Sequence, residues 1–398
     1  MRLANAGGPI LRKRWISPGS IPRRVRSRGF VSLLSLPTGS LPRTCPVRPK
    51  SVFFPPQYKF KAVGKRRDFS SGSVLQNPSS DVKMADTNNR LRYVDIGINL
   101  GDPVFRGEYN GKQVHDDDMA DIIQRARDVG CEKFMVTGSD LEESRHAVQL
   151  ARDYPGLCYA TVGVHPCQAK TFDSFPGGPS KLLEELRDLA LESKKSGLAV
   201  AFGEFGLDYD RLFLSSKEQQ LKYFEAQLDL AVDIQLPLFL HSRAASEDFE
   251  RLLAPRLPKL PKKGLVHSFT GTLEEMNRLV ALGLDIGVNG CSMKTEENLE
   301  VVKAIPLDRI QIETDGPWCE IRPSHASAKY LEGAPELPKA VKKEKWQQGC
   351  MVKGRNEPAA IIHVAHVIAK VKGISVEEVC EAAWNNSIRM FGLGNETA

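Results

Sequence analysis

Short apolar runs alternate with longer amphipathic stretches from Leu91 to the end of the chain. Eight of these runs have the length and the β-branched or aromatic content of buried strands. They end at intervals of 22 to 39 residues, near Asn99, Thr137, His165, Glu204, His241, His267, Asn289 and Asp315. Each interval is long enough for a strand, a helix and two loops. The alternation predicts an α/β fold, and eight such units favour a (β/α)8 TIM barrel over a doubly wound sheet.

The intervals between the runs have the periodicity of amphipathic helices. In 219–234, one face of the helix would carry the apolar residues Leu221, Phe224, Leu228, Ala231 and Val232. We expect two further helices near 359–371 and 376–390, the second of which would complete the ring. Before them, the segment 316–354 is rich in Pro, Lys and Glu and forms an insert after the last strand.

The net charge of +6 hides two unlike regions. Residues 1–86 hold 17 Lys or Arg against three acids, and this Ser-rich, acid-poor composition is typical of a disordered mitochondrial targeting segment. The alternatives are a basic tail with no targeting role, or translation from Met84, which would leave the protein in the cytoplasm or nucleus. The remaining residues carry a net charge of −8, so no broad basic surface would attract nucleic acid.

Composition narrows the class of protein further. No apolar run approaches the ~18 residues that span a bilayer, so we expect no membrane-spanning segment. The eight cysteines form no C-x-x-C pair, which argues against a zinc ribbon, a redox dithiol and a disulfide framework. We therefore predict that the cysteines are reduced thiols.

Five side chains that can bind metal ions stand at predicted strand ends: His165, Glu204, His241, His267 and Asp315. Catalytic groups of (β/α)8 barrels come from the carboxyl ends of several strands, so these five would converge at one mouth. Imidazole and carboxylate ligands suit Zn²⁺, Mn²⁺ or Mg²⁺, and a carboxylate such as Glu204 can bridge two ions. Two ions ~3.5–4 Å apart would polarise a phosphoryl or acyl centre and lower the pKa of a bound water. Asp315 could then accept the proton.

Each of these residues also has a purely structural interpretation. A single histidine at a strand end is more often a packing or capping residue than a ligand. The whole set nevertheless argues for a cation, because burying two carboxylates and three imidazoles without one would be costly. Cys167, two residues after His165, is either a zinc ligand or, as we favour, a loop thiol.

Seven motifs resemble, in order and spacing, the TatD family of metal-dependent deoxyribonucleases, a branch of the amidohydrolase-like barrels. They are Y-V-D-I-G-I-N-L (93–100), G-V-H-P (163–166), G-E-F-G-L-D (203–208), L-H-S-R (240–243), V-H-S-F-T-G (266–271), E-T-D-G-P (313–317) and R-N-E-P (355–358). The resemblance covers 91–392 and implies one barrel domain of the metal-dependent hydrolase type. It implies that Glu204 bridges two divalent ions, with Asp315 on one of them. His241 and His267 would bind the other. It also implies phosphodiester hydrolysis, including 3′-to-5′ trimming of single-stranded DNA.

One motif departs from the pattern of many family members. They carry H-x-H at the end of the first strand, where this chain has Gly97 and Asn99. A subgroup shares this pattern, and D-I-G-I-N-L together with K-K-E-K-W at 342–346 is similar to the eukaryotic TatD-domain deoxyribonucleases. A site left with Glu204, Asp315 and waters favours Mg²⁺ or Mn²⁺ over Zn²⁺, with phosphate oxygens of the substrate completing it.

Candidate substrate contacts surround the predicted ligands. Arg243 and Arg355 are suited to bind phosphate, and Asn99 ends the first strand beside the ligands. By position and resemblance, His165 would donate to a phosphate or to the leaving oxygen. Asp208 would accept a hydrogen bond from an imidazole and orient it.

The 316–354 insert interleaves aromatic rings with cations. Trp318, Tyr330 and Trp346 lie among Arg322, Lys329, Lys339, Lys342, Lys343, Lys345 and Lys353. Such rings can stack on bases while the cations hold phosphates. Glutamates dilute the charge, so a solvated loop with packing aromatics is an equal interpretation.

Three functions are consistent with these residues. The first is a divalent-metal-dependent deoxyribonuclease, a hydrolase of ester bonds that acts as a 3′-5′ exonuclease on single-stranded ends. The second is a metal-dependent amide or ester hydrolase, such as a D-aminoacyl-tRNA deacylase. The third is a scaffold that merely binds nucleic acid, which the intact ligand set disfavours. We expect DNA as substrate and no membrane, and the sequence leaves the number of subunits open, a monomer included.

Overall fold

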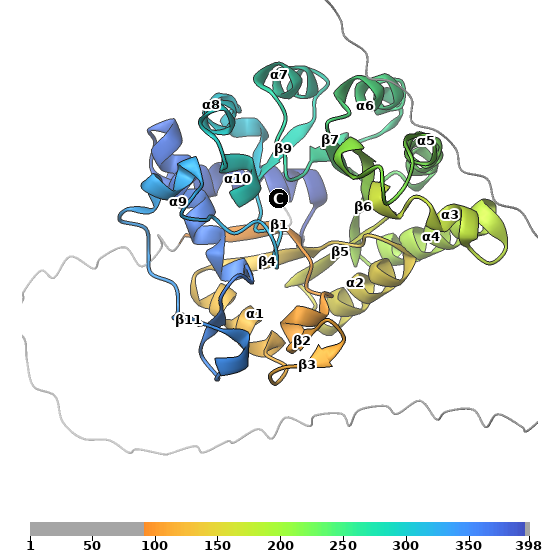
Figure 1. Ribbon diagram of the computed structural model, residues 1–398. Coiled ribbons are helices and arrows are strands. Elements are labelled where there is room, and N and C mark those ends of the chain that lie inside the picture. The colour runs from red at the N-terminus through yellow and green to blue at the C-terminus, as the bar shows by residue number, and fades with distance from the viewer. Residues whose placement is uncertain (1–90, 395–398) are drawn as a thin grey trace, which may run out of the picture. The chain divides into compact units, whose positions relative to one another are not determined.

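Eight parallel strands form one sheet in the order β1-β4-β5-β6-β7-β8-β9-β10. The computed structural model describes residues 91–394, and Figure 1 shows the strands inside a ring of helices. The strands are Tyr93–Ile98 (β1), Cys131–Val136 (β4), Cys158–Val162 (β5), Ala199–Asp208 (β6), Leu238–Arg243 (β7), Gly264–Val266 (β8), Asp285–Val288 (β9) and Ile310–Ile312 (β10). The targeting segment predicted over 1–86 lies outside the described residues.

The segment after β10 joins the last strand to the first. The Asp315 N–H donates to the Gly97 carbonyl at 2.8 Å, and the Asn99 N–H donates to the Gly316 carbonyl at 3.0 Å. These bonds close the sheet, so the predicted (β/α)8 TIM barrel is confirmed. They also place Asp315 directly beside β1.

Helices alternate with the strands as the apolar periodicity predicts. They are Met119–Asp128 (α1), Leu141–Asp153 (α2), Thr171–Ser174 (α3), Gly178–Lys195 (α4), Lys217–Ile234 (α5), Ser246–Leu253 (α6), Leu273–Ala281 (α7), Glu296–Ala304 (α8), Ile361–Lys372 (α9) and Val376–Phe391 (α10). α5 begins before the predicted residue 219 because Ser216 and Gln219 form a capping box at its first turn. On its predicted face Phe224, Leu228 and Ala231 are buried.

Apolar side chains fill the barrel near the amino ends of the strands. Val94, Ile96 and Leu265 belong to one buried cluster with Trp384 and Phe391 of α10. α10 therefore covers this end of the barrel. The opposite end, where the strands finish, is left for polar side chains.

The 316–354 insert contains only short elements. They are the 3-10 helices η7 (Ala326–Leu331) and η8 (Lys343–Lys345) and the strands β11 (Ala340–Val341) and β12 (Met351–Val352), which pair in parallel. A second small pair, β2 (Glu108–Tyr109) and β3 (Lys112–Gln113), is antiparallel and follows β1.

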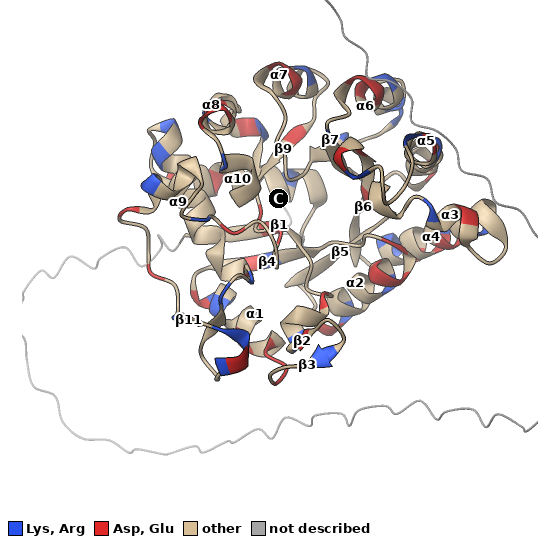
Figure 2. Cartoon of the chain, viewed as in Figure 1, with Lys and Arg blue, Asp and Glu red and all other residues tan. Residues whose placement is uncertain are grey.

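Both signs of charge are spread over the outer helices. Figure 2 shows Lys and Arg close to Asp and Glu on α5, α6 and α7. Within residues 91–394, no single helix is long and apolar enough to cross a membrane. Only the bent pair Pro358–Lys372 and Val376–Phe391 meets the length and hydropathy requirement when the two are taken together.

Candidate active site

The carboxyl ends of the strands surround a cavity of about 510 Å³. Most of the predicted site residues line it, namely Asn99, His165, Glu204, His241, Arg243, His267 and Asp315. The cavity is also lined by Arg211, Lys294, Trp318 and Arg322. Residues far apart in sequence therefore meet in one place, and among the predicted site residues only Asp208 and Arg355 lie outside the lining.

A bulge in β6 aims Glu204 into the barrel. The sequence predicts that the strand ends near Glu204, but β6 continues to Asp208, and its register with β7 shifts at Glu204. There the Glu204 N–H donates to the Gly138 carbonyl at 2.9 Å. Such a bulge turns a side chain away from its regular direction. The preceding Gly203 is required by close packing, because a Cβ there would lie 2.0 Å from the Phe239 carbonyl oxygen.

One carboxylate oxygen of Glu204 faces three imidazoles. Its Oε1 lies 2.8 Å from His267 Nε2, 2.9 Å from His241 Nδ1 and 3.3 Å from His165 Nε2. Burial alone would raise the pKa of Glu204, but His267 and His165 hold it well below its usual range. Glu204 is therefore ionised at neutral pH.

A second carboxylate contacts each of two imidazoles. His241 Nε2 lies 3.2 Å from Oδ2 of Asp208, the residue to which the sequence assigns an orienting role. His267 Nδ1 lies 3.1 Å from Glu313 Oε2. Burial would lower the pKa of His267, but Glu204 and Glu313 raise it well above its usual range. Rings fixed between two acceptors in this way are typical of metal-binding histidines.

Glu313 is a site residue that the sequence patterns do not single out. It lies two residues before Asp315 in the E-T-D-G-P motif, it is fully buried, and it accepts from the Ser268 N–H at 2.5 Å. A Cβ at Gly97 would lie 2.3 Å from Glu313 Oε2. A histidine at position 97 would need space for its side chain. In this chain the Glu313 carboxylate occupies that space.

Asp315 lies among other acids in the same cavity. Its Oδ1 accepts from Asn99 Nδ2 at 3.1 Å. Burial raises the pKa of Asp315 to about 7, with Glu313 and Glu204 acting in the same direction and His267 and Asn99 in the opposite one. A cation beside Asp315 would favour its charged form and offset both its burial and its repulsion by Glu313 and Glu204.

The donor set fits a divalent cation. Ligand atoms of His165, Glu204 and His241 lie within 4.8 Å of one another, while His267 and Asp315 line the same cavity. Imidazole nitrogen and carboxylate oxygen are ligands that Zn²⁺, Mn²⁺ and Mg²⁺ accept. His165, for which the sequence predicts a phosphate contact, therefore also lies within reach of a bound ion.

The two predicted phosphate-binding arginines have different surroundings. Arg243 lines the cavity, and its Nε is buried without a hydrogen-bond partner among the described residues. Arg355 is only 4% exposed and donates to Asp118 Oδ1 and Glu357 Oε1, both at 2.9 Å. Arg355 thus anchors the end of the insert to the start of α1. Its Nη atoms face two buried carboxylates, its Nε has no hydrogen-bond partner among the described residues, and the phosphate contact stays a prediction.

Cys291 and Cys319 form a disulfide in the wall of the cavity, with their Cα atoms 5.0 Å apart. The prediction of reduced thiols is wrong for this pair, whereas Cys131, Cys158, Cys167, Cys350 and Cys380 are free. The two partners follow β9 and β10, which are neighbours in the sheet. The two cysteines are 28 residues apart, so no short sequence motif indicates that they pair. The bond fixes the loop that carries Trp318.

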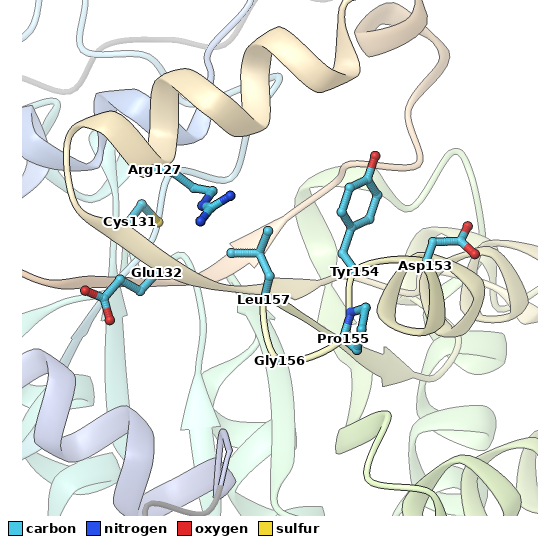
Figure 3. Close-up of a pocket in the computed structure, with 8 residues that line it drawn as sticks. All are labelled: Arg127, Cys131, Glu132, Asp153, Tyr154, Pro155, Gly156 and Leu157. Atoms are coloured by element: carbon cyan, nitrogen blue, oxygen red, sulfur yellow. The ribbon is translucent and has the colours of Figure 1, made fainter. Parts of the chain in front are cut away.

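A second hollow, of about 670 Å³, lies where β4 and β5 begin, at the opposite end of the strands. Its lining comprises Arg127, Cys131, Glu132 and residues 153–157. Figure 3 shows Glu132 and Asp153 on opposite sides of it. Within the described part of the chain, the compact group of metal-capable side chains is in the other cavity. The chemistry of the lining, rather than its volume, therefore identifies the functional site.

The sequence pattern of one family, described as TatD related DNase, matches residues 94–392. The chain belongs to the TatD family of deoxyribonucleases. The match includes all of the barrel strands except Tyr93, the first residue of β1, and every residue that lines the cavity. It confirms the resemblance carried by the seven motifs, and with it the class of hydrolases that act on ester bonds.

The matches to relatives in the TatD family extend over nearly the full length of each relative. Deoxyribonuclease Tat-D of Schizosaccharomyces pombe is 54% identical over 303 residues, which are 76% of this chain and 96% of the relative. The 3′-5′ ssDNA/RNA exonuclease TatD of Erwinia amylovora is 35% identical over 75% of this chain and 99% of its own. Among solved structures, an uncharacterized amidohydrolase from Saccharomyces cerevisiae is 36% identical, with a TM-score of 0.68 over 76% of this chain and 100% of that one.

Proposed function

We propose that this TatD-family chain releases nucleotides from the 3′ ends of single-stranded DNA by hydrolysing phosphodiester bonds with two divalent ions, Mg²⁺ or Mn²⁺ in preference to Zn²⁺. One observation carries the proposal: the ionised Glu204 faces three imidazoles in a cavity that cationic side chains also line. When bound, the ions would polarise the phosphoryl group and lower the pKa of a water molecule.

The side chains of the cavity have separate roles in this reaction. Glu204, His241 and His267 would hold one ion, and Glu204 with Asp315 the other. Asp315, which lines the cavity beside Glu204, would also accept a proton from the attacking water.

His165 and Arg243 are the donors for the reacting phosphate. Burial lowers the pKa of His165, but Glu204 raises it, and the net shift is upward. His165 Nδ1 accepts from the Cys167 N–H at 3.1 Å, so the ring proton is carried by Nε2, which can donate to a phosphate or to the leaving oxygen. The unpartnered Nε of Arg243 gains an acceptor when a phosphate enters.

Two observations support a single-stranded DNA end as the substrate. The relatives include a deoxyribonuclease and a 3′-5′ exonuclease of single-stranded DNA and RNA. The cavity volume of about 510 Å³ is that of a small-ligand pocket, which suits the end of one strand rather than a duplex.

Substitution of the two carboxylates tests the proposal. On a 5′-labelled single-stranded oligonucleotide with Mn²⁺, Glu204→Gln and Asp315→Asn should each lower kcat/KM by ~100-fold or more, because each removes a charge at the reacting centre. Glu132→Gln and Asp153→Asn make the same chemical changes in the hollow of Figure 3 and should leave kcat/KM unchanged. Full activity of the two cavity variants would contradict the proposal.

The same ligand set would also polarise a carbonyl, as in an amide, an ester or a D-aminoacyl-tRNA. No contact among the described residues favours that substrate over a phosphodiester. If the protein deacylates D-aminoacyl-tRNA and leaves the oligonucleotide intact, the carbonyl substrate replaces the one proposed.

A further inference from the structure

Trp318 exposes a large aromatic ring in the wall of the cavity. The residue is 55% exposed, which is unusual for an indole, and it lines the cavity together with Asp315. The backbone N–H of Trp318 donates to the backbone carbonyl of Asp315 at 3.0 Å. The residues that carry the ring and the catalytic carboxylate therefore belong to one tight turn. A singly exposed apolar side chain is normal on a protein surface, but this one lies in the wall of the functional cavity, where a ligand would contact it.

The backbone on either side of Trp318 is fixed. The Pro317 carbonyl accepts from the Asn356 N–H at 2.9 Å, and Cys319 is bonded to Cys291. The backbone that carries the indole is therefore held in place before a ligand arrives. Binding then loses little backbone conformational entropy at this turn.

Besides Arg211, which pairs with Asp208, three cations share the cavity with this ring. Arg243 ends β7, Lys294 follows β9, and Arg322 lies four residues after Trp318. Burial lowers the pKa of Lys294, and the charges of Arg243 and Arg322 lower it further, so the three cations repel one another. An anion between them would relieve this repulsion.

The other two aromatic residues of the insert lie elsewhere. Trp346 stacks on His115 with ring centroids 4.9 Å apart, and both border a different hollow. Tyr330 packs against the buried core beside Lys329. Of the three rings that the sequence places among cations, Trp318 is therefore the one that faces the substrate cavity.

We propose that Trp318 is the platform on which an unpaired base of the substrate stacks, while the three cations bind the adjoining phosphate. This inference rests on the proposed function and specifies how the strand is recognised. Every base has a flat π face, so the platform accepts any sequence. A base inside a duplex already stacks on both neighbours, so the platform favours unpaired 3′ ends.

Removal of the ring should affect binding of bases rather than chemistry. For a single-stranded oligonucleotide, Trp318→Ala should raise KM ~10-fold, in line with the loss of one base–aromatic stack, with kcat nearly unchanged. Trp318→Phe, which keeps an aromatic face, should restore most of the affinity. On an oligonucleotide whose 3′-terminal nucleotides lack bases, wild type and Trp318→Ala should have the same KM.

Trp346→Ala is the matched control, because it removes the same type of residue from the same insert outside the cavity. It should leave KM unchanged on both substrates. An equal rise in KM on the normal and the abasic oligonucleotide in Trp318→Ala would show a structural role and overturn the proposal. An unchanged KM on both would also overturn it.

Fluorescence separates this proposal from the proposed function. In the Glu204→Gln variant, a single-stranded oligonucleotide should quench indole fluorescence, and the additional change Trp318→Phe should abolish the quenching. If the wild-type protein cleaves no DNA but shows this quenching, the nuclease proposal is overturned and the proposed stacking of a base on Trp318 stands. DNA cleavage without any Trp318-dependent quenching would overturn the platform alone.

Discussion

Glu313 holds His267 from outside the cavity. Its Oε2 lies 3.1 Å from His267 Nδ1, and Glu204 Oε1 lies 2.8 Å from Nε2 of the same ring. A carboxylate on one nitrogen fixes the orientation of the ring and makes the other nitrogen a better metal ligand. Glu313 therefore acts through His267 and is a positioning residue.

Glu313→Gln should weaken metal binding. The amide keeps the shape of the side chain but removes its charge, so the affinity for Mn²⁺ should fall ~10–100-fold, as measured by calorimetric titration. Glu132→Gln, at an exposed position far from the imidazoles, is the control. The positioning role would be contradicted if Glu313→Gln bound Mn²⁺ as tightly as the wild type.

The site residues differ in how well their roles can be predicted from the sequence. Glu204, His241, His267 and Asp315 interrupt or follow apolar runs, so their positions near the strand ends can be predicted. The role of Glu313 depends on the space left by Gly97 on another strand. A contact of this kind across the barrel has no local sequence pattern.

The elements of the barrel follow from periodicity, but their irregularities do not. The eight strands and the main helices appear where apolar spacing predicts them, because each buries one face against its neighbours. The bulge in β6 and the end of the strand at Asp208 depend on pairing with β7. The Cys291–Cys319 bond likewise depends on the pairing of β9 with β10.

The surroundings of a single side chain are also not predictable from composition. The sequence predicts two phosphate-binding arginines, and the structure places Arg243 at the cavity but Arg355 between Asp118 and Glu357. Arg243 ends β7, Arg355 follows β12, and each belongs to one of the motifs, so composition does not distinguish their surroundings. The packing of the insert against α1 places the Nη atoms of Arg355 beside carboxylates.

The barrel of residues 91–394 separates its apolar and polar ends. α10 covers the amino end of the barrel, and the described metal-capable group lies toward the carboxyl end. Figure 2 shows both signs of charge on the outer helices. Within residues 91–394, we expect affinity for a nucleic acid to come from the cavity, through Trp318 and the cations around it.

We propose that residues 1–86, with 17 Lys or Arg and three acids, direct the chain to mitochondria. With a fluorescent tag at the C-terminus, the full chain should be found in mitochondria. A chain that starts at Met84 should stay in the cytoplasm or nucleus. Cytoplasmic or nuclear signal alone from the full chain would contradict this assignment.

The nuclease proposal depends on a cation site built around Glu204. X-ray diffraction from crystals grown with Mn²⁺ can locate this site through the anomalous scattering of manganese. We expect an anomalous peak bonded to Glu204 and His241, which disappears in Glu204→Gln. No peak at Glu204, at a Mn²⁺ concentration that supports DNA cleavage, would contradict the proposed mechanism.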